Sequence, residues 1–340
     1  MVELIRLFRR KPLGFSLGGN RLRWMIVTAF VVGLLALLGQ FSRSGRDPGF
    51  DGKSLSEWLD QYRTAWNPGE TNQVGGAAEA EHAIRNIGQD AVPELLRMLR
   101  KTDSPIDKKL HFLFAKLPIL REPQPAWICN HNAAEGFRIL GADAKEAVPE
   151  VIKVFIEDIS PESRFAAAVA LRGIGPSASN ALPALLEATT NLNSGVRANA
   201  AFALGGVTVS TDATIAALIR CLDDPDLLVR KMAIRSLGDF GANASEALPY
   251  LGQEAVAPMS RNRLEAIAAI GRIAAGPEEA VPSLIRCLRD TNAIVREAAT
   301  DALAAFGSQA RAAIPLLTEM QNDPNPKVVA AANRALETIQ

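Results

Sequence analysis

Apolar positions from about residue 160 onward recur with a period of 33 residues. The stretch LIRCLDDPDLLVRKMA, which begins at Leu218, is nearly repeated 66 residues later as LIRCLRDTNAIVREAA, which begins at Leu284. Each period holds an arginine slot, a small residue three positions later and a leucine or isoleucine seven positions later. Steps of this size keep side chains on one helix face, so the pattern predicts an α-helix in every period. The arginines are Arg164, Arg197, Arg230, Arg263 and Arg296.

A glycine and a proline at fixed positions predict a second helix in each period. Glycine just past a helix end can adopt the left-handed conformation that terminates the helix. Proline suits the first turn of the next helix, where its missing N–H is not needed. Each unit is therefore predicted to contain a helix A, a glycine stop, a short loop and a helix B that begins near a proline. The glycines are Gly88, Gly141, Gly175, Gly241 and Gly307, and the prolines are Pro93, Pro149, Pro183, Pro249, Pro282 and Pro315.

One helix pair of this kind cannot bury its apolar faces alone, but a stack of pairs can. The segments AVPELLRML, ALPALL and AVPSLIRCL, together with the VR..A..AL helices, resemble HEAT repeats, including the short HEAT-like repeats of phycobilin lyases. The resemblance covers about residues 75–340. It implies an all-α fold, a right-handed α-solenoid of HEAT-like helix pairs. It specifies the architecture rather than the function, because such solenoids serve many roles. We expect residues 101–132 to form an insertion between the first two units.

The segment from Trp24 to Phe41 has no charged residue and predicts a transmembrane anchor, residues 24–41. A helix of this length spans about 27 Å, close to the roughly 30 Å of a hydrocarbon core. Basic residues are concentrated in residues 1–23, so the positive-inside bias predicts a cytoplasmic N-terminus. The solenoid is then expected on the extracytoplasmic (periplasmic) side of the inner (plasma) membrane. A cleaved signal peptide and a buried helix of the soluble domain are the alternatives.

Residues 42–74 are expected to be a linker that contains one amphipathic helix, residues 54–66. Ser54 and Glu57 have the spacing of a capping box. The segment is similar to the GK.LS.WL element of some bacterial membrane-tethered HEAT proteins. The helix is expected either to cap the open end of the solenoid or to dock a partner or a second copy. Its apolar face comprises Leu55, Trp58, Leu59 and Tyr62.

The charge of the chain is unevenly distributed. The whole sequence has 37 basic and 37 acidic residues, of which residues 1–49 hold eight and two. Residues 50–340 therefore hold 29 basic and 35 acidic residues, a net charge of −6. Binding to nucleic acid needs a concentrated basic face, so we expect no nucleic-acid partner.

Candidate catalytic and metal-binding residues are few. Cys129, His131 and His111 lie in or near the insertion, but their spacing matches no usual zinc site. His82 has no nucleophile or acid at the spacing of a hydrolase triad. Cys221 is expected to be a core residue, as is its counterpart two units later. We therefore expect no metal, no cofactor and no catalysis. The alternative, implied by the resemblance to lyase repeats, is a lyase-type enzyme or a protein that binds a tetrapyrrole-like ligand.

Acidic residues accompany the arginine column. An aspartate lies six residues before several of the arginines, while Asn191 and Ala257 take this position in two units. An acid in a turn can cap the next helix and pair with a nearby arginine. The resemblance implies that such columns form ladders between units, with phosphate binding as the alternative. The aspartates are Asp158, Asp224, Asp290 and Asp323.

The resemblance also implies that B helices line the concave side of the stack. Four residues after each proline slot, these helices carry side chains of both signs. Mixed charge favours a protein or peptide partner over a simple ion, and a solvated face without a ligand is the alternative. The sequence thus predicts a membrane-tethered scaffold. The predicted partner-binding residues are Arg97, Lys153, Glu187, Arg220, Tyr250, Gln253, Arg286, Arg289 and Glu319.

Overall fold

The computed structural model describes residues 47–65, 74–104, 124–157, 159–207 and 212–339. The chain divides into two compact units, Met1–Pro48 and Gly49–Gln340, and the second is described below. The predicted cytoplasmic segment 1–23 and the predicted anchor 24–41 lie outside the described residues. Within the described part of the chain, no helix has the length and apolar character needed to span a membrane.

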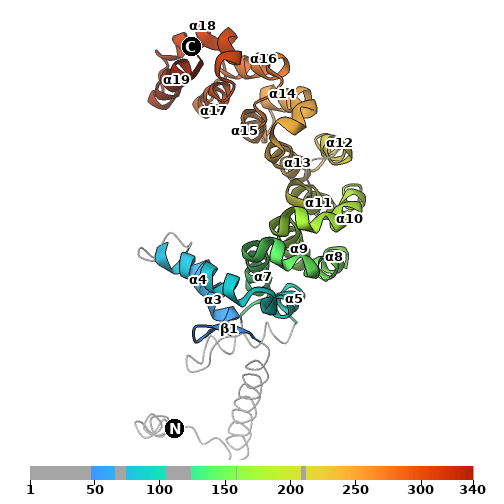
Figure 1. The fold of residues 1–340 in the computed structure, drawn as a ribbon. Coiled ribbons are helices and arrows are strands. Elements are labelled where there is room, and N and C mark those ends of the chain that lie inside the picture. Colours follow the sequence, from blue (N-terminus) through green and yellow to red (C-terminus); the bar gives the residue numbers. More distant parts are fainter. Residues whose placement is uncertain (1–46, 66–73, 105–123, 158, 208–211, 340) are drawn as a thin grey trace, which may run out of the picture. The chain divides into compact units, whose positions relative to one another are not determined.

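Residues 49–340 form a stack of helix pairs, which confirms the predicted all-α repeat architecture (Figure 1). A-type and B-type helices alternate along the sequence. The A helices are α4 (Val74–Ile87), α7 (Ala126–Leu140), α9 (Pro161–Ile174), α11 (Ser194–Val207), α13 (Leu227–Asp239), α15 (Arg263–Ile273), α17 (Ala293–Ala304) and α19 (Pro326–Ile339). The B helices are α5 (Val92–Leu99), α8 (Val148–Ile156), α10 (Leu182–Ala188), α12 (Asp212–Cys221), α14 (Leu248–Val256), α16 (Pro277–Cys287) and α18 (Ile314–Met320).

The junctions between helix A and helix B follow the predicted glycine pattern. All five predicted glycines have positive φ, from 51° to 75°, a region that costs a residue with a Cβ about 1–2 kcal/mol. Ala274 takes the glycine position after α15 and adopts a φ of 43° all the same. A short 3₁₀ segment follows each glycine: η1 (Gly88–Ala91), η2 (Gly141–Ala147), η3 (Gly175–Ala181), η4 (Gly241–Ala247) and η5 (Gly307–Ala313).

The prolines behave as predicted in five units and differently in the sixth. Five of them occupy the first turn of a B helix, where no intrahelical N–H donor is required. Pro282 instead lies inside α16, because Pro277 begins that helix more than a turn earlier. The prediction that Pro282 begins a helix is therefore wrong.

The insertion between the first two units is shorter than the sequence suggested. Helix α7 begins at Ala126, directly after Pro125 in an extended conformation. Residues 126–132 are therefore helical and belong to the second unit rather than to the insertion. The predicted helix within residues 106–117 lies outside the described residues.

The N-terminal end of the stack is closed by a hairpin and a helix. Strands β1 (Gly49–Phe50) and β2 (Lys53–Ser54) pair antiparallel, a feature that the sequence analysis did not foresee. Helix α3 (Leu55–Ala65) follows and begins with the predicted capping box, in which the Ser54 N–H donates to Glu57 Oε2 at 2.9 Å. Its predicted apolar face is buried, and the helix packs against α4 and α7. The helix thus covers the first A helices of the stack.

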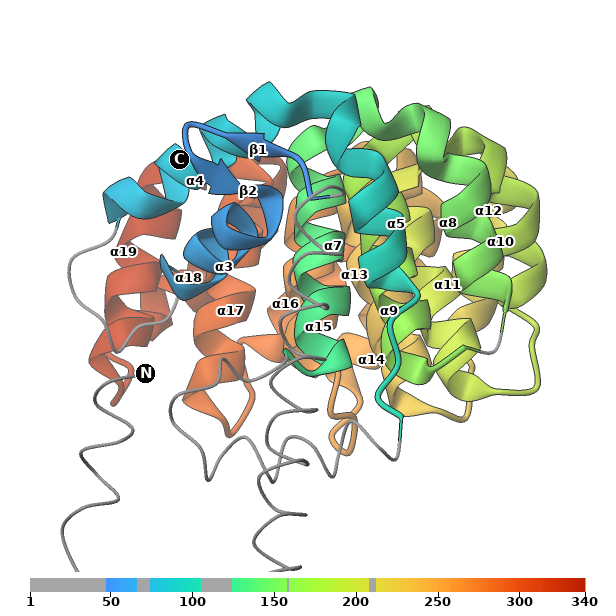
Figure 2. The ribbon, with the colours of Figure 1, turned by 90° about the horizontal axis from the view of Figure 1, so that it is seen from below.

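The A helices from α7 to α19 form the inner row, and the B helices from α5 to α18 form the outer row. Neighbouring inner-row helices pack directly on one another along the whole row, whereas in the outer row only α14 and α16 do so to a similar degree. A stack that is tighter on one side bends toward that side. Within residues 49–340 the inner row accordingly lies on the concave side of the arc (Figure 1). In Figure 2, α8, α10 and α12 again lie outside α9, α11 and α13.

Small side chains let the inner-row helices approach one another. The predicted alanine column is completely buried in every unit. Glycines bring the helices closer still, since a Cβ on Gly173 would lie 2.7 Å from the Arg138 Cα of the preceding helix. A Cβ on Gly206 would lie 2.6 Å from the carbonyl oxygen of Arg172. The alanine column comprises Ala167, Ala200, Ala233, Ala266, Ala299 and Ala332.

Candidate functional site

The arginine column links successive units through a repeated set of hydrogen bonds. Arg197 donates from Nε and Nη2 to the two carboxylate oxygens of Asp224 in the following turn, at 2.6 and 2.8 Å. Its Nη1 donates to the Asn191 carbonyl of its own turn at 2.8 Å. Arg296 and Asp323 repeat this bidentate geometry, with both contacts at 2.8 Å. Arg197 and Arg296 therefore each fix the turn before their own helix and the turn of the next unit.

These carboxylates also organise the turns that carry them. Asp224 accepts the N–H of Asp226 at 2.9 Å, and Asp323 accepts the N–H of Asn325 at 2.8 Å. Hydrogen bonds from Arg197 hold the pKa of Asp224 below its usual value, and those from Arg296 do the same for Asp323. Arg263 and Asp290 form a third pair. The structure thus has the inter-unit ladder that the resemblance implied at these three junctions, and the Asp158 position lies outside the described residues. Arg230, whose counterpart in the next turn is Ala257, donates to the Asp224 and Pro225 carbonyls of its own turn at 2.7 and 3.2 Å.

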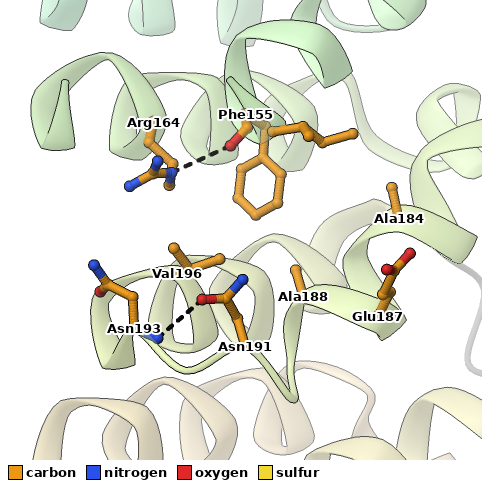
Figure 3. A pocket seen from close by; sticks show the side chains of 9 residues that line it. Phe155, Arg164, Ala184, Glu187, Ala188, Asn191, Asn193 and Val196 are labelled. Atoms are coloured by element: carbon orange, nitrogen blue, oxygen red, sulfur yellow. Dashed lines mark hydrogen bonds between the residues drawn. The ribbon is translucent and has the colours of Figure 1, made fainter. Parts of the chain in front are cut away.

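Asn191 takes the aspartate position between α10 and α11. Arg164, in the preceding unit, donates from Nε to the Phe155 carbonyl at 3.3 Å. A hollow of about 380 Å³ lies at this junction and is lined by residues from α8 to α11 (Figure 3). Glu187, one of the predicted partner-binding residues, lines the same hollow.

All nine predicted partner-binding residues are exposed, but eight of them lie on the outer-row helices, and Arg289 lies in the turn that follows α16. The expectation that B helices line the concave side is therefore wrong for this chain, because the A helices pack more tightly and draw the curvature toward themselves. Two of the nine side chains are held by neighbours on their own helix. Arg97 donates from Nε to Glu94 at 2.7 Å, and Lys153 pairs with Glu150 at 2.5 Å. Whether any of the nine residues binds a partner stays a prediction.

The inner row presents a cluster that the sequence analysis missed. Phe165 on α9 is 51% exposed, and its ring centroid lies 6.2 Å from that of Phe202 on α11. The guanidinium of Arg172 lies over the Phe202 ring, 4.5 Å from the centroid. Such a cation–π contact is attractive because the ring face is electron-rich. Two aromatic rings and a cation thus share one part of the concave face.

Arg172 extends across α11 to the next inner-row helix. Its Nη1 donates to the Phe202 carbonyl at 2.6 Å, and its Nη2 pairs with Asp239 on α13. Arg272 on α15 approaches the same carboxylate, with 3.9 Å between Nε and Oδ1. Gly205 makes room for this crossing, since a Cβ there would lie 2.5 Å from Arg172 Nη1. We call Phe165, Arg172, Phe202, Asp239 and Arg272 the inner-wall cluster.

The cysteines and histidines considered above do not form a metal site in the part of the chain that the structure describes. Cys129, Cys221 and Cys287 are buried thiols, and burial raises the pKa of the latter two to about 11. In the residues that the structure describes, no group of three or more His, Cys, Asp or Glu side chains is placed to hold a metal ion. His131 is exposed on α7, where a loop was expected, and His111 lies outside the described residues.

Two features of the site could have been predicted from the sequence. Phe165 directly follows the slot arginine, a position that holds alanine in α11 and lysine in α13. Asn130 precedes its glycine stop by the same eleven residues that separate Arg164 from Gly175. The structure buries Asn130, whose amide nitrogen donates to the carbonyls of Met98 and Leu99 at 2.9 and 3.0 Å. It therefore occupies the arginine slot of the second unit.

Comparison with known proteins finds one repeat family that is similar to part of the chain. Residues 182–258 and 248–337 match the family described as HEAT repeats. No protein with a curated description matches the chain. Similar solved structures include an engineered protein that is 25% identical, covering 56% of this chain and 96% of its own, with a TM-score of 0.43.

A designed armadillo repeat protein in complex with a (KR)4 peptide is 20% identical, covering 57% of this chain and 99% of its own, with a TM-score of 0.45. Human deoxyhypusine hydroxylase in complex with glycerol is also 20% identical, covering 84% and 96%, with a TM-score of 0.33. At TM-scores this low, the structural likenesses carry no inference about function.

Replacing Asp224 by asparagine should weaken the stack at one junction. An asparagine at this position can maintain the hydrogen bond within the turn, as Asn191 does: its side-chain Oδ1 accepts the N–H of Asn193 at 2.9 Å. The variant therefore loses the charged bonds to Arg197, and we expect the free energy of unfolding to fall by about 2 kcal/mol at pH 7. The control is Asp226→Asn, since asparagine already caps α17 at this position. We expect the control to change stability by less than about 0.5 kcal/mol in urea unfolding.

The effect of Asp224→Asn should also depend on pH. The folded-state pKa of Asp224 lies below its ordinary value of 3.8. The carboxylate therefore stabilises the fold fully above that value, and this contribution is lost as the pH falls through the folded-state pKa. The stability difference between wild type and variant should persist at pH 5 and shrink below about pH 3.8. A difference that stays constant down to acid unfolding would contradict the ladder.

Proposed function

We propose that this protein is a non-catalytic scaffold that binds another protein along its inner row, because residues 182–337 match the family described as HEAT repeats and the described residues between 74 and 181 form helix pairs of the same kind. The inner-wall cluster carries this proposal. Its Phe165 is 51% exposed and lies beside the Phe202 ring on the concave face. A large exposed aromatic beside an ordered cation is typical of a protein-binding surface. The curvature supports the proposal, since a concave wall can contact a partner from several units.

We further propose that residues 24–41 tether the scaffold to the inner membrane, with residues 42–340 on the extracytoplasmic side. The uncharged segment and the basic residues that precede it support this orientation. A reporter enzyme that is active only outside the cytoplasm, fused after Gln340, should therefore be active. Activity restricted to a cytoplasmic reporter at the same position would contradict the proposed orientation.

Photo-crosslinking in intact cells distinguishes the two rows. A photoreactive amino acid replaces Ala268, which is exposed on α15 of the inner row, or Gln253, which is exposed on α14 of the outer row. We expect a discrete protein adduct from position 268 and none from position 253. An adduct only from position 253 would favour the outer row, and no adduct from either position would contradict the scaffold proposal.

A further inference from the structure

The inner wall from α9 to α15 has a net positive charge, opposite in sign to that of residues 50–340. Its helices expose or half-expose seven basic side chains and three acidic ones. Residues 50–340 as a whole carry a net charge of −6, so the local excess of positive charge is a feature of this wall. The basic residues are Arg172, Arg197, Arg230, Lys231, Arg235, Arg263 and Arg272, and the acidic ones are Glu162, Asp239 and Glu265.

Part of this charge is paired within the wall, which fixes its position. Lys231 pairs with Glu265 at 2.5 Å, and Asp239 is shared by Arg172 and Arg272. Arg235 is exposed on α13 between these pairs, and its backbone carbonyl accepts from Arg272 at 3.4 Å. The wall is therefore a positioned array of cations, and an ordered array loses little conformational entropy when it binds.

Apolar surface lies within the same wall. Phe165 and Phe202 form the aromatic pair at its N-terminal end, and Leu264 on α15 is 38% exposed. Arg172 lies against Phe202, so a carboxylate that approaches this arginine also approaches the aromatic rings. Cationic and apolar groups are therefore available to one ligand at the same time.

The C-terminal part of the inner row has no such excess of positive charge. Helices α17 and α19 expose or half-expose three acidic side chains and three basic ones, which are Glu297, Asp301, Glu337, Arg296, Lys327 and Arg334. Arg334 pairs with Asp301 at 3.1 Å. The acidic part of a partner segment would therefore lie against α9 to α15.

We infer that the inner wall from α9 to α15 binds an extended, acidic peptide segment that carries a large apolar side chain. The inference rests on the proposed function and specifies the chemistry of the partner. Four neighbouring helices at roughly 10 Å spacing span about 30 Å. Extended chain covers about 3.3 Å per residue, so the segment in contact has about nine residues. Its carboxylates would pair with Arg235 and Arg272, and its apolar side chain would pack on Phe165.

Binding of labelled peptides to the full-length chain tests this inference by fluorescence anisotropy. The probe is a twelve-residue peptide that alternates glutamate with phenylalanine and leucine, and matched peptides carry lysine for glutamate or serine for the apolar residues. We expect the acidic apolar peptide to bind at least about tenfold more tightly than either matched peptide, and more weakly as salt is raised. Equal or tighter binding of the lysine peptide would overturn the inference.

Two substitutions locate the binding site. Arg235→Ala and Phe165→Ala remove exposed side chains and should each weaken binding of the acidic peptide about fivefold or more. Arg286→Ala removes an exposed arginine of the outer row and should leave binding unchanged. Loss of binding in Arg286→Ala, with normal binding in Arg235→Ala, would overturn the inference.

One further outcome separates this inference from the proposed function. Equally tight binding of an uncharged apolar peptide with glutamine for glutamate, sensitive to Phe165→Ala and insensitive to Arg235→Ala, would overturn the acidic specificity. The inner row would then still be the binding surface. The photo-crosslinking experiment tests the proposed function separately, because the absence of inner-row adducts would contradict that function.

Discussion

Close approach between neighbouring A helices is the constraint on which the rest of this structure depends. A buried alanine column and glycines such as Gly173 and Gly206 let these helices pack backbone to backbone. The B helices carry larger side chains and stand further apart, so residues 49–340 curve toward the A helices. This difference decides which side chains line the concave face. It also lets Arg172 cross a neighbouring helix and meet Asp239.

The arginine–aspartate ladder acts together with this packing. Small apolar side chains bring the helices close but specify little about their relative rotation. A bidentate pair such as Arg197–Asp224 has a fixed geometry and joins each helix to the next turn. Because both partners are largely buried, the pairs are weakly screened by salt. Packing therefore sets the distance between units, and the ladder sets their register.

Much of the fold could be predicted from the sequence because the same local sequence pattern recurs in several units. The glycine stops, the proline starts and the buried columns follow from backbone conformation and helix periodicity. The position of Pro282 inside its helix was not predicted, because a second proline, Pro277, begins that helix five residues earlier. The concave side could not be predicted in the same way. It depends on a comparison of packing in the two rows, whereas the sequence pattern shows an apolar face on both helices of a pair.

The inner-wall cluster was missed for a related reason. Phe165 departs from the repeat, and the position of Arg172 is arginine only in α7 and α9 and glycine in the next three A helices, whereas periodicity emphasises what recurs. Their partners, Phe202 and Asp239, lie one and two units away, so the cluster exists only once the units are stacked. Binding surfaces on repeat proteins are expected at such departures, because positions that maintain the stack cannot vary freely.

The central claim is that the A helices form the concave side, and spin-label distances in solution test it most directly. Positions 235 and 301 on the inner row are 66 residues apart, as are positions 220 and 286 on the outer row. Pulsed electron paramagnetic resonance measures the distance within each pair after labelling at introduced cysteines. If the A helices form the concave side, the distance between positions 235 and 301 is shorter than the distance between positions 220 and 286. Equal distances, or a shorter distance in the outer row, would contradict this claim.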